Sequence, residues 1–318
     1  MAGLPTQQAT GTASGPGPGA TTGTADGVNK PYERTMFSYD PIDEFTATIA
    51  DWIYHHTRGL QNVEIEAKIG TLVDKSTEHR LFMPVMTETI LLENTDGIRF
   101  VSELGIHHHS AMNKLMNQLV TYTNAKGYQG SKVVYKRQEE IDYFHKIEPG
   151  MLPPAVLESL GPLNLDGKED KIRVTRDNKD GKAKSDHAMV KRRIASLEVF
   201  CPKRLYDYRI SINTETPVPL PPPSSAAMFW RDKNRVTYQH ELIQVDLTLV
   251  KSTFPMTGVQ TSHELELEFQ DASKLVAAGH EARAEGASQD WTPFDDMCHI
   301  FLNNVRMLIR NMPELQPM

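Results

Sequence analysis

The sequence has little cysteine, no long apolar run and no excess of basic residues. Its only two cysteines, Cys201 and Cys298, lie far apart in the chain. They exclude a disulfide framework and a cysteine-based zinc site, and they fit a reducing compartment, the cytosol or the nucleus. No run of ~18 apolar residues occurs, which predicts no transmembrane helix. The N-terminal residues lack a basic region followed by an apolar one, which predicts no secretory signal.

The charge balance and the glycine pattern exclude further classes. Lys and Arg total 34 against 41 Asp and Glu, so the formal charge is −7. A mildly acidic chain is a poor non-specific binder of nucleic acid, so any such contact must be local. No dinucleotide-binding or P-loop glycine pattern is present. The length of 318 residues suits two domains or one large β-barrel domain.

The first 30 residues are of low complexity. Gly, Pro, Thr, Ala and Ser fill 22 of these positions, and Asp26 and Lys30 are the only charges. Such a segment buries too little apolar surface to offset its ordering entropy, which predicts a disordered tail. The tail could be a partner arm or a passive extension. We therefore expect a tail over 1–36 and a single folded domain over 37–318.

A period of two dominates the folded part, with polar and apolar residues alternating strictly in five runs. Shorter strand-like runs lie between them. The long runs cover 63–69, 206–215, 233–240, 242–250 and 263–270, and the short ones 98–101, 132–137, 141–147, 171–176 and 189–193. Strands at this density predict an antiparallel sheet or barrel, of the α+β class and mainly β.

Three segments have helical spacing. Asp40 as N-cap and Pro41 at the first position would begin a helix whose apolar residues recur every three or four positions. The others cover 111–123 and 294–309, where stripes of Met and aromatic residues predict core packing. The stretch 272–290, rich in Ala, Gly and Ser, predicts an exposed loop that leaves the core of the domain.

The polar faces of the first and last strands are not ordinary solvated faces. They carry Glu64, Glu66 and Lys68 on the first strand and Glu264, Glu266 and Glu268 on the last. Carboxylates at i, i+2 and i+4 are only ~7 Å apart along a strand and repel one another unless cations lie among them. Other strands supply such cations, which disfavours a purely solvent-facing arrangement.

Seven carboxylates and seven bases share these faces in all. The carboxylates are Glu64, Glu66, Glu215, Asp246, Glu264, Glu266 and Glu268. The bases are Lys68, Arg173, Lys191, Arg193, Arg209, Lys233 and Arg235. If the faces point inward, they predict a hydrated, nearly neutral interior. Clustered carboxylates bind Mg²⁺ or Mn²⁺, and Lys and Arg bind phosphate oxygens, so the pattern favours phosphoryl transfer.

Other conspicuous residues have plainer explanations. His107, His108 and His109 lack metal-ligand spacing and predict a solvated loop. The two cysteines lack the surroundings of a nucleophile. Trp230 could stack on an RNA base, but a packed loop aromatic is the simpler interpretation.

The E-x-E-x-K run at 64–68 and the alternating glutamates at 263–268 resemble the triphosphate tunnel metalloenzymes. Within them, the chain is most similar to the fungal and protozoan RNA 5′-triphosphatases, which begin mRNA cap formation. Further stretches resemble that group over roughly 37–312. These are 41–45, 191–194, 210–217, 233–238, 245–248 and 301–304.

The resemblance implies an eight-stranded antiparallel tunnel with supporting helices. It implies a metal held by Glu64, Glu66 and Glu268, and water held by Glu266 and Asp246. It also implies bracing or water-orienting roles for Glu215 and Glu264, and phosphate binding by Arg173, Lys191, Lys233 and Arg235. We count the remaining bases, Lys68, Arg193 and Arg209, with the phosphate-binding set. Arg176 lies close to Arg173, so the register of that strand is open.

The resemblance further implies a nuclear enzyme, a homodimer and a guanylyltransferase partner. Yeast-type members dock that partner through a Trp-rich segment ahead of the catalytic domain, and residues 1–36 contain no Trp. Docking would then use another surface or a segment outside this sequence. The alternatives are a tunnel phosphohydrolase for tripolyphosphate or thiamine triphosphate, and a non-catalytic polyphosphate-binding module.

Overall fold

The computed structural model of the chain describes residues 36, 41–93, 95–160, 169–284 and 291–313. The chain divides into two compact units, Met1–Ile42 and Asp43–Met318. The tail predicted over 1–36 lies, except for Met36, outside the described residues. All helices and strands of the described residues belong to the second unit.

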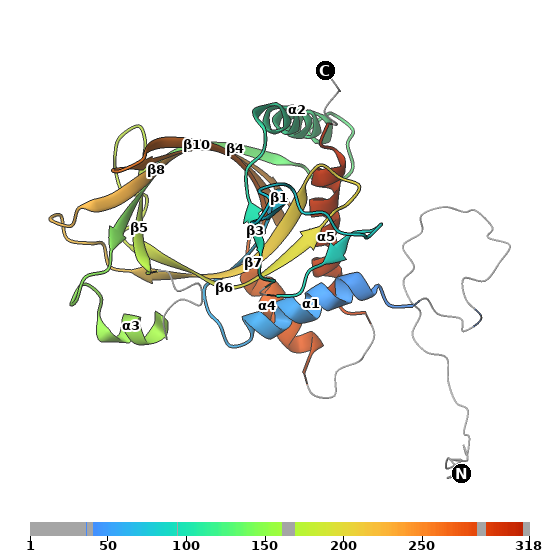
Figure 1. Cartoon of the computed structure of the whole chain (residues 1–318), viewed down its shortest axis with the longest axis horizontal. Coiled ribbons are helices and arrows are strands. Elements are labelled where there is room, and N and C mark those ends of the chain that lie inside the picture. Colours follow the sequence, from blue (N-terminus) through green and yellow to red (C-terminus); the bar gives the residue numbers. More distant parts are fainter. Residues whose placement is uncertain (1–35, 37–40, 94, 161–168, 285–290, 314–318) are drawn as a thin grey trace, which may run out of the picture. The chain divides into compact units, whose positions relative to one another are not determined.

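Eight strands of the second unit close into an antiparallel barrel, as predicted (Figure 1). Their order is β10-β9-β8-β4-β5-β6-β7-β1, and pairing of β1 with β10 closes the ring. They are β1 (Val63–Asp74), β4 (Val134–Lys146), β5 (Lys171–Asp177), β6 (Ala188–Phe200), β7 (Asp207–Val218), β8 (Ala227–His240), β9 (Ile243–Phe254) and β10 (Gly258–Phe269). Two short strands, β2 (Thr89–Ile90) and β3 (Ile98–Val101), pair with β6 and β1.

Among the described residues, five helices accompany the barrel, and α1, α4 and α5 pack together against one side of it (Figure 1). They are α1 (Glu44–Thr57), α2 (Ile106–Thr123), α3 (Pro154–Leu160), α4 (Ala272–Ala282) and α5 (Pro293–Arg310). None of the helices in the described ranges is long and apolar enough to cross a membrane.

The main hydrophobic core lies between the barrel wall and these helices. The apolar positions of β1, such as Ile65 and Ile69, are fully buried and share one cluster with Ile49 and Ile53 of α1 and Phe301 of α5. Because side chains alternate along a strand, burying these residues outside the barrel directs Glu64, Glu66 and Lys68 inward. The core therefore fixes the orientation of the charged faces.

The first helix begins three residues after the predicted start. Its N-cap is Asp43, whose side chain accepts hydrogen bonds from the backbone N–H of Thr46 at 3.3 Å and from its hydroxyl at 2.6 Å. The bond to Thr46 satisfies a backbone N–H that has no partner within the first turn of the helix, so Asp43 is the N-cap. Asp40, the predicted cap, lies outside the described residues.

The exposed loop predicted over 272–290 is wrong for its first part, which forms α4. Asp271 caps the helix by accepting from the backbone N–H of Ser273 at 3.1 Å, and Leu275 is 1% exposed. Gly279 lets the ring of Phe294 approach closely. Burial of the apolar face of α4 stabilises the helix, although the segment is rich in small and polar residues.

The solvated loop predicted for His107–His109 is also wrong, because these residues form the first turn of α2. His108 is buried with its Nδ1 3.0 Å from the hydroxyl of Tyr206. Burial, together with the nearby His263, lowers the pKa of His109 to about 4. Trp230 is likewise not a loop residue, since it lies on β8 with 38% of its surface exposed. Both cysteines are buried, which raises the pKa of each thiol and agrees with an inert role.

Gly70 of β1 is required by the close approach of β3. A Cβ at this position would lie 2.2 Å from the carbonyl oxygen of Val101 and 2.7 Å from the ring of Phe100. We expect Gly70→Ala to cost about 1–3 kcal/mol of the free energy of unfolding, as overpacked sites do. Thermal unfolding beside Thr71→Ala, which adds no atom there, measures it. An unchanged melting temperature would contradict the packing of β3 on β1.

Candidate active site

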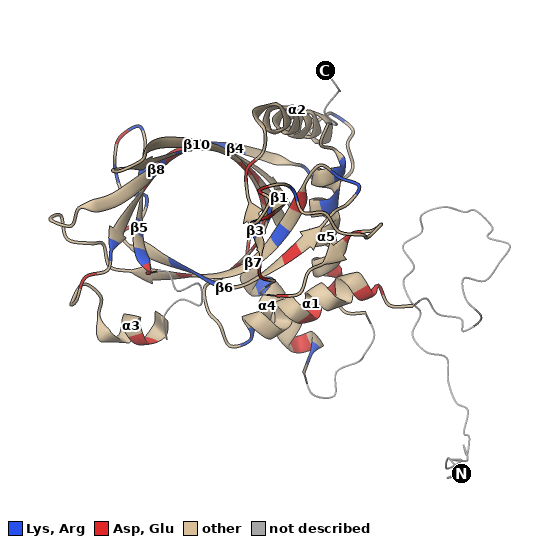
Figure 2. Ribbon diagram, viewed as in Figure 1, with Lys and Arg blue, Asp and Glu red and all other residues tan. Residues whose placement is uncertain are grey.

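The barrel encloses a charged cavity of 790 Å³. All eight barrel strands contribute lining residues, and basic and acidic positions are distributed around the ring (Figure 2). The walls carry few apolar side chains, so the interior is not a hydrophobic core. The charged interior expected from the strand faces is therefore present.

Twelve of the fourteen predicted site residues line this cavity. They are Glu64, Glu66, Lys68, Arg173, Lys191, Arg193, Glu215, Lys233, Arg235, Glu264, Glu266 and Glu268. The position of Arg173 also settles the register of β5, because Arg176 is exposed and donates to the carbonyl oxygen of Gly181 at 3.1 Å. Asp246 and Arg209 are the two that do not line it.

Three carboxylates converge where β1 meets β10. Glu64, Glu66 and Glu268 each offer an oxygen within 4.8 Å of the others. The pairing of Glu66 with Glu268 across the two strands produces this convergence. The amide nitrogen of Asn213 on β7 donates to Glu64 at 2.9 Å and to Glu66 at 3.1 Å, which orients both carboxylates. Among the described residues, this is the one group with the geometry of a metal site.

The three carboxyls differ in their electrostatic surroundings. Burial and then Glu64, Asp246 and Glu266 raise the pKa of Glu268 to about 8. Burial also raises the pKa of Glu64, although Lys191 opposes it. For Glu66, burial acts upward, but Lys191 and Lys68 outweigh it and lower the pKa. A cation between these oxygens would displace the proton that Glu268 holds at neutral pH.

Basic residues surround this acidic cluster on one wall. Lys191 of β6 forms an ion pair with Glu64, and its Nζ lies 3.6 Å from Glu66 and 3.8 Å from Glu215. Arg173 of β5 donates to Glu215 at 2.9 Å. Glu215 therefore braces two bases that face the cavity.

The facing wall repeats the arrangement. Lys233 of β8 lies 2.6 Å from Asp142 and 3.6 Å from Glu140. Arg235 donates to Asp246 at 2.9 Å. Burial lowers the pKa of Lys233, and Asp142 opposes that effect. These pairs fix the bases that would meet a polyanion inside the tunnel.

The last strand supplies two further carboxylates near the cluster. Glu266 forms an ion pair with Lys68, which together with Arg235 outweighs burial and holds the pKa of Glu266 far below its usual range. Glu264 accepts from Arg231 at 2.7 Å. Glu266 is thus an ionised acceptor beside the cluster.

Asp246 is on the inward face of β9, but Arg235 covers it and it does not line the cavity. Its side chain is 1% exposed and accepts from Arg235 at 2.9 Å and from the hydroxyl of Thr237 at 2.5 Å. In this arrangement Asp246 contacts Arg235 and has little open surface of its own, and the water-holding role that the resemblance implied stays a prediction.

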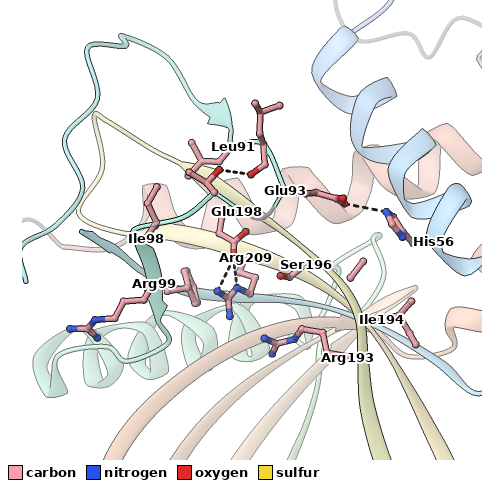
Figure 3. Close-up of a pocket in the computed structure, with 14 residues that line it drawn as sticks. His56, Leu91, Glu93, Ile98, Arg99, Arg193, Ile194, Ser196, Glu198 and Arg209 are labelled. Atoms are coloured by element: carbon pink, nitrogen blue, oxygen red, sulfur yellow. Dashed lines mark hydrogen bonds and ion pairs between the residues drawn. The ribbon is translucent and has the colours of Figure 1, made fainter. Parts of the chain in front are cut away.

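Arg209 lines a separate cavity of 320 Å³ (Figure 3). It donates to Glu198 at 2.8 Å and lies over the ring of Phe100, 4.8 Å from its centroid. Arg193 lines both this cavity and the tunnel. Arg209 was predicted to face the tunnel, but it lines this second cavity, where Phe100 of β3 packs on its guanidinium.

Several cavity residues were missed in the sequence. Glu140 and Asp142 of β4 oppose Lys233, and Arg231 lies two residues before it on the same face. Asp142 lies in the run 141–147, which was predicted as a strand, but Phe144 on the same face interrupts the polar pattern, so the face did not stand out. Arg231 was missed because β8 begins at Ala227, six residues before the predicted start.

The arrangement can hold a hard cation and a chain of phosphates at once. Three convergent carboxylates supply oxygen ligands of the type that Mg²⁺ and Mn²⁺ prefer. The braced bases on both walls, Arg173, Lys191, Lys233 and Arg235, match phosphate oxygens. The residues present therefore fit a divalent metal together with a polyphosphate.

Comparison with known proteins identifies relatives along most of the chain. The family described as "mRNA capping enzyme, beta chain" matches residues 39–314. The mRNA-capping enzyme subunit beta of Schizosaccharomyces pombe is 32% identical, over 87% of this chain and 84% of that protein. The subunit beta of Cryptococcus neoformans is also 32% identical, over 88% of this chain and 65% of that protein.

The fold agrees with two solved structures of an RNA triphosphatase from S. pombe. The structure of the S. pombe Pct1 RNA triphosphatase has 30% sequence identity and a TM-score of 0.75, over 89% of this chain and 98% of that one. The structure of Pct1 in complex with the Spt5 CTD has 31% sequence identity and a TM-score of 0.74, over 89% of this chain and 100% of that one. With a family match over most of its length and the same closed tunnel, this chain belongs to the mRNA capping enzyme beta-chain family of fungal-type, tunnel-fold RNA triphosphatases.

Proposed function

We propose that this chain is a metal-dependent polynucleotide 5′-triphosphatase, which removes the γ-phosphate from triphosphate-ended RNA in the first step of mRNA capping. The observation that carries the proposal is the acidic triad Glu64, Glu66 and Glu268 on the wall of a tunnel that braced bases also line. A protein that only bound anions would gain nothing from clustered carboxylates.

The three carboxylates would hold Mg²⁺ or Mn²⁺. Their donor atoms are all oxygens, and Asn213 and Lys191 fix two of them in place. When bound, such an ion neutralises phosphate oxygens and lowers the cost of charge in the transition state.

The protein's own groups position the reactants. Arg173, Lys191, Lys233 and Arg235 bind the phosphate oxygens and stabilise the charge that builds up on transfer. Glu266, kept ionised by Lys68, accepts a hydrogen bond from the attacking water and aligns it with the γ-phosphorus. Glu215, Glu264 and Asp246 hold the bases Arg173, Arg231 and Arg235 in place. Because phosphoryl transfer has a loose transition state, alignment and charge stabilisation provide most of the catalysis.

Phosphate release with and without metal tests the proposal. Purified protein treated with EDTA should release no phosphate from triphosphate-ended RNA, and added Mg²⁺ or Mn²⁺ should restore release. Activity that persists in EDTA would rule out the role of the acidic triad. Release from tripolyphosphate or thiamine triphosphate but not from RNA would favour a different tunnel phosphohydrolase.

The separate position of Arg209 yields its own prediction. Lys191→Ala should lower the rate at least ~10-fold, because it removes a base from the phosphate path. Arg209→Ala should leave the rate close to that of the wild type, since its guanidinium is paired with Glu198 outside the tunnel. Steady-state kinetics of the two variants decide the matter, and an equal loss would return Arg209 to the phosphate-binding set.

The partners follow from the family. We propose a nuclear protein that acts beside an mRNA guanylyltransferase and forms a homodimer. Because the S. pombe relative was solved in complex with the Spt5 CTD, contact with such a peptide belongs to the same proposal. Co-purification with each partner tests it.

A further inference from the structure

Three phenylalanines line one end of the tunnel. Phe144, Phe229 and Phe254 belong to β4, β8 and β9, which are neighbours in the sheet. Each lies within two residues of the end of its strand. The three rings therefore gather at one mouth of the barrel.

The rings form a continuous stack. The centroids of Phe144 and Phe229 are 4.5 Å apart with an angle of 9° between the planes. Phe229 and Phe254 are 5.1 Å apart at 28°. Aromatic rings arranged in this way present flat apolar surfaces of fixed orientation.

Core packing does not account for these residues. None of the three belongs to a hydrophobic cluster of the described residues, and all three are only half-buried. They face a cavity whose other walls are almost entirely charged. Apolar rings kept partly exposed in such a cavity point to a ligand that has a flat apolar part and a charged part.

The stack adjoins the phosphate-binding bases. Phe144 is the direct cross-strand partner of Arg173, and Phe229 lies two residues from Arg231 on the same face of β8. Directly opposite residues on neighbouring strands have Cβ atoms about 4.5–5.5 Å apart. A triphosphate held by the bases would thus place the attached nucleoside beside the rings.

We propose that the trio Phe144, Phe229 and Phe254 is a stacking platform for the first bases of the RNA, and that it makes the tunnel prefer RNA to inorganic tripolyphosphate. This inference rests on the proposed function. Stacking suits a capping enzyme, because every base has a flat face and recognition would tolerate any sequence. Inorganic tripolyphosphate has no ring and would gain nothing from the platform.

Kinetics of one variant on two substrates, RNA and tripolyphosphate, test the platform. Phe229→Leu keeps apolar volume at the centre of the stack but removes its ring. We expect it to lower kcat/KM for a triphosphate-ended oligoribonucleotide at least ~10-fold and to change that for tripolyphosphate by less than ~2-fold, since stacking acts only on bases. Trp230→Leu is the matched control, because Trp230 is an exposed aromatic on the same strand that does not line the tunnel. Equal losses on both substrates, or no loss on RNA, would overturn the inference.

A binding measurement separates this inference from the catalytic proposal. Triphosphate-ended oligoribonucleotides that carry 2-aminopurine at the first, second or third position lose fluorescence when the probe stacks. The wild type should quench at least one probe, and Phe229→Leu should relieve the quenching. Quenching without phosphate release would refute the catalytic proposal alone. Phosphate release without quenching at any position would refute the platform alone.

Discussion

Replacing Glu268 by alanine is expected to abolish release of the γ-phosphate while leaving the barrel folded. Glu268 supplies one of three oxygens that lie within 4.8 Å of each other, and the loss of one ligand should raise the barrier by at least ~1.4 kcal/mol, or tenfold in rate. The same loss is expected for Glu64→Ala and Glu66→Ala.

The stability of these variants should behave differently from their activity. Burial and the neighbouring carboxylates Glu64, Asp246 and Glu266 raise the pKa of Glu268 to about 8, so its charge is unfavourable in the metal-free protein. Because Glu268 is largely protonated at neutral pH, its removal should leave the metal-free melting temperature nearly unchanged there. Above about pH 8, where the carboxylate would be charged, removing it relieves repulsion and the melting temperature should rise.

The matched control is Glu139→Ala, because Glu139 belongs to β4 but does not line the tunnel and pairs with Arg137. Its activity and melting temperature should resemble those of the wild type. A Glu268→Ala protein that keeps more than a tenth of the wild-type rate would remove Glu268 from the ligand set.

The second large effect concerns Arg235, which has a role in the tunnel and another in the wall. Arg235→Ala should lower activity and also destabilise the protein, because it leaves Asp246 buried at 1% exposure without its cation. Breaking a buried ion pair from one side typically costs about 3–5 kcal/mol. Arg235→Lys should rescue only part of the activity, since an ammonium cannot bind two phosphate oxygens as a planar guanidinium does.

A double variant separates the two roles of Arg235. Arg235→Ala with Asp246→Asn removes the buried charge as well as its partner, so much of the stability should return while activity stays low. Kinetics and thermal unfolding of the single and double variants provide the test. Recovery of both properties in the double variant would show that Arg235 acts only through folding.

The acidic cluster could be predicted from sequence because its geometry is local. Side chains alternate on a strand, so Glu64 with Glu66, and Glu266 with Glu268, had to share faces. Apolar partners such as Ile65 and Leu267 then had to be buried on the other side, and the structure buries both completely or nearly so. Only the pairing of β1 with β10, which brings Glu268 beside Glu66, could not be predicted without the structure.

What the sequence could not reveal depends on contacts between distant elements. Arg209 has the predicted position on its strand, but Phe100 of β3, which pairs with β1, packs on its guanidinium. Asp246 faces the right way, yet Arg235 lies in front of it. The helix α4 has a composition typical of a loop, and its packing against α5 and β1 determines its structure.

The most direct measurement follows both ends of the triphosphate. One RNA is labelled at the γ-phosphate and an identical RNA at the α-phosphate, and each is incubated with the protein and Mg²⁺ or Mn²⁺. We predict that the wild type releases the γ-label as orthophosphate and leaves the α-label on a diphosphate-ended RNA. Glu66→Ala should release neither label and leave the RNA triphosphate-ended. Tight binding of tripolyphosphate with no phosphate released by either metal would contradict the catalytic account and identify a binding module instead.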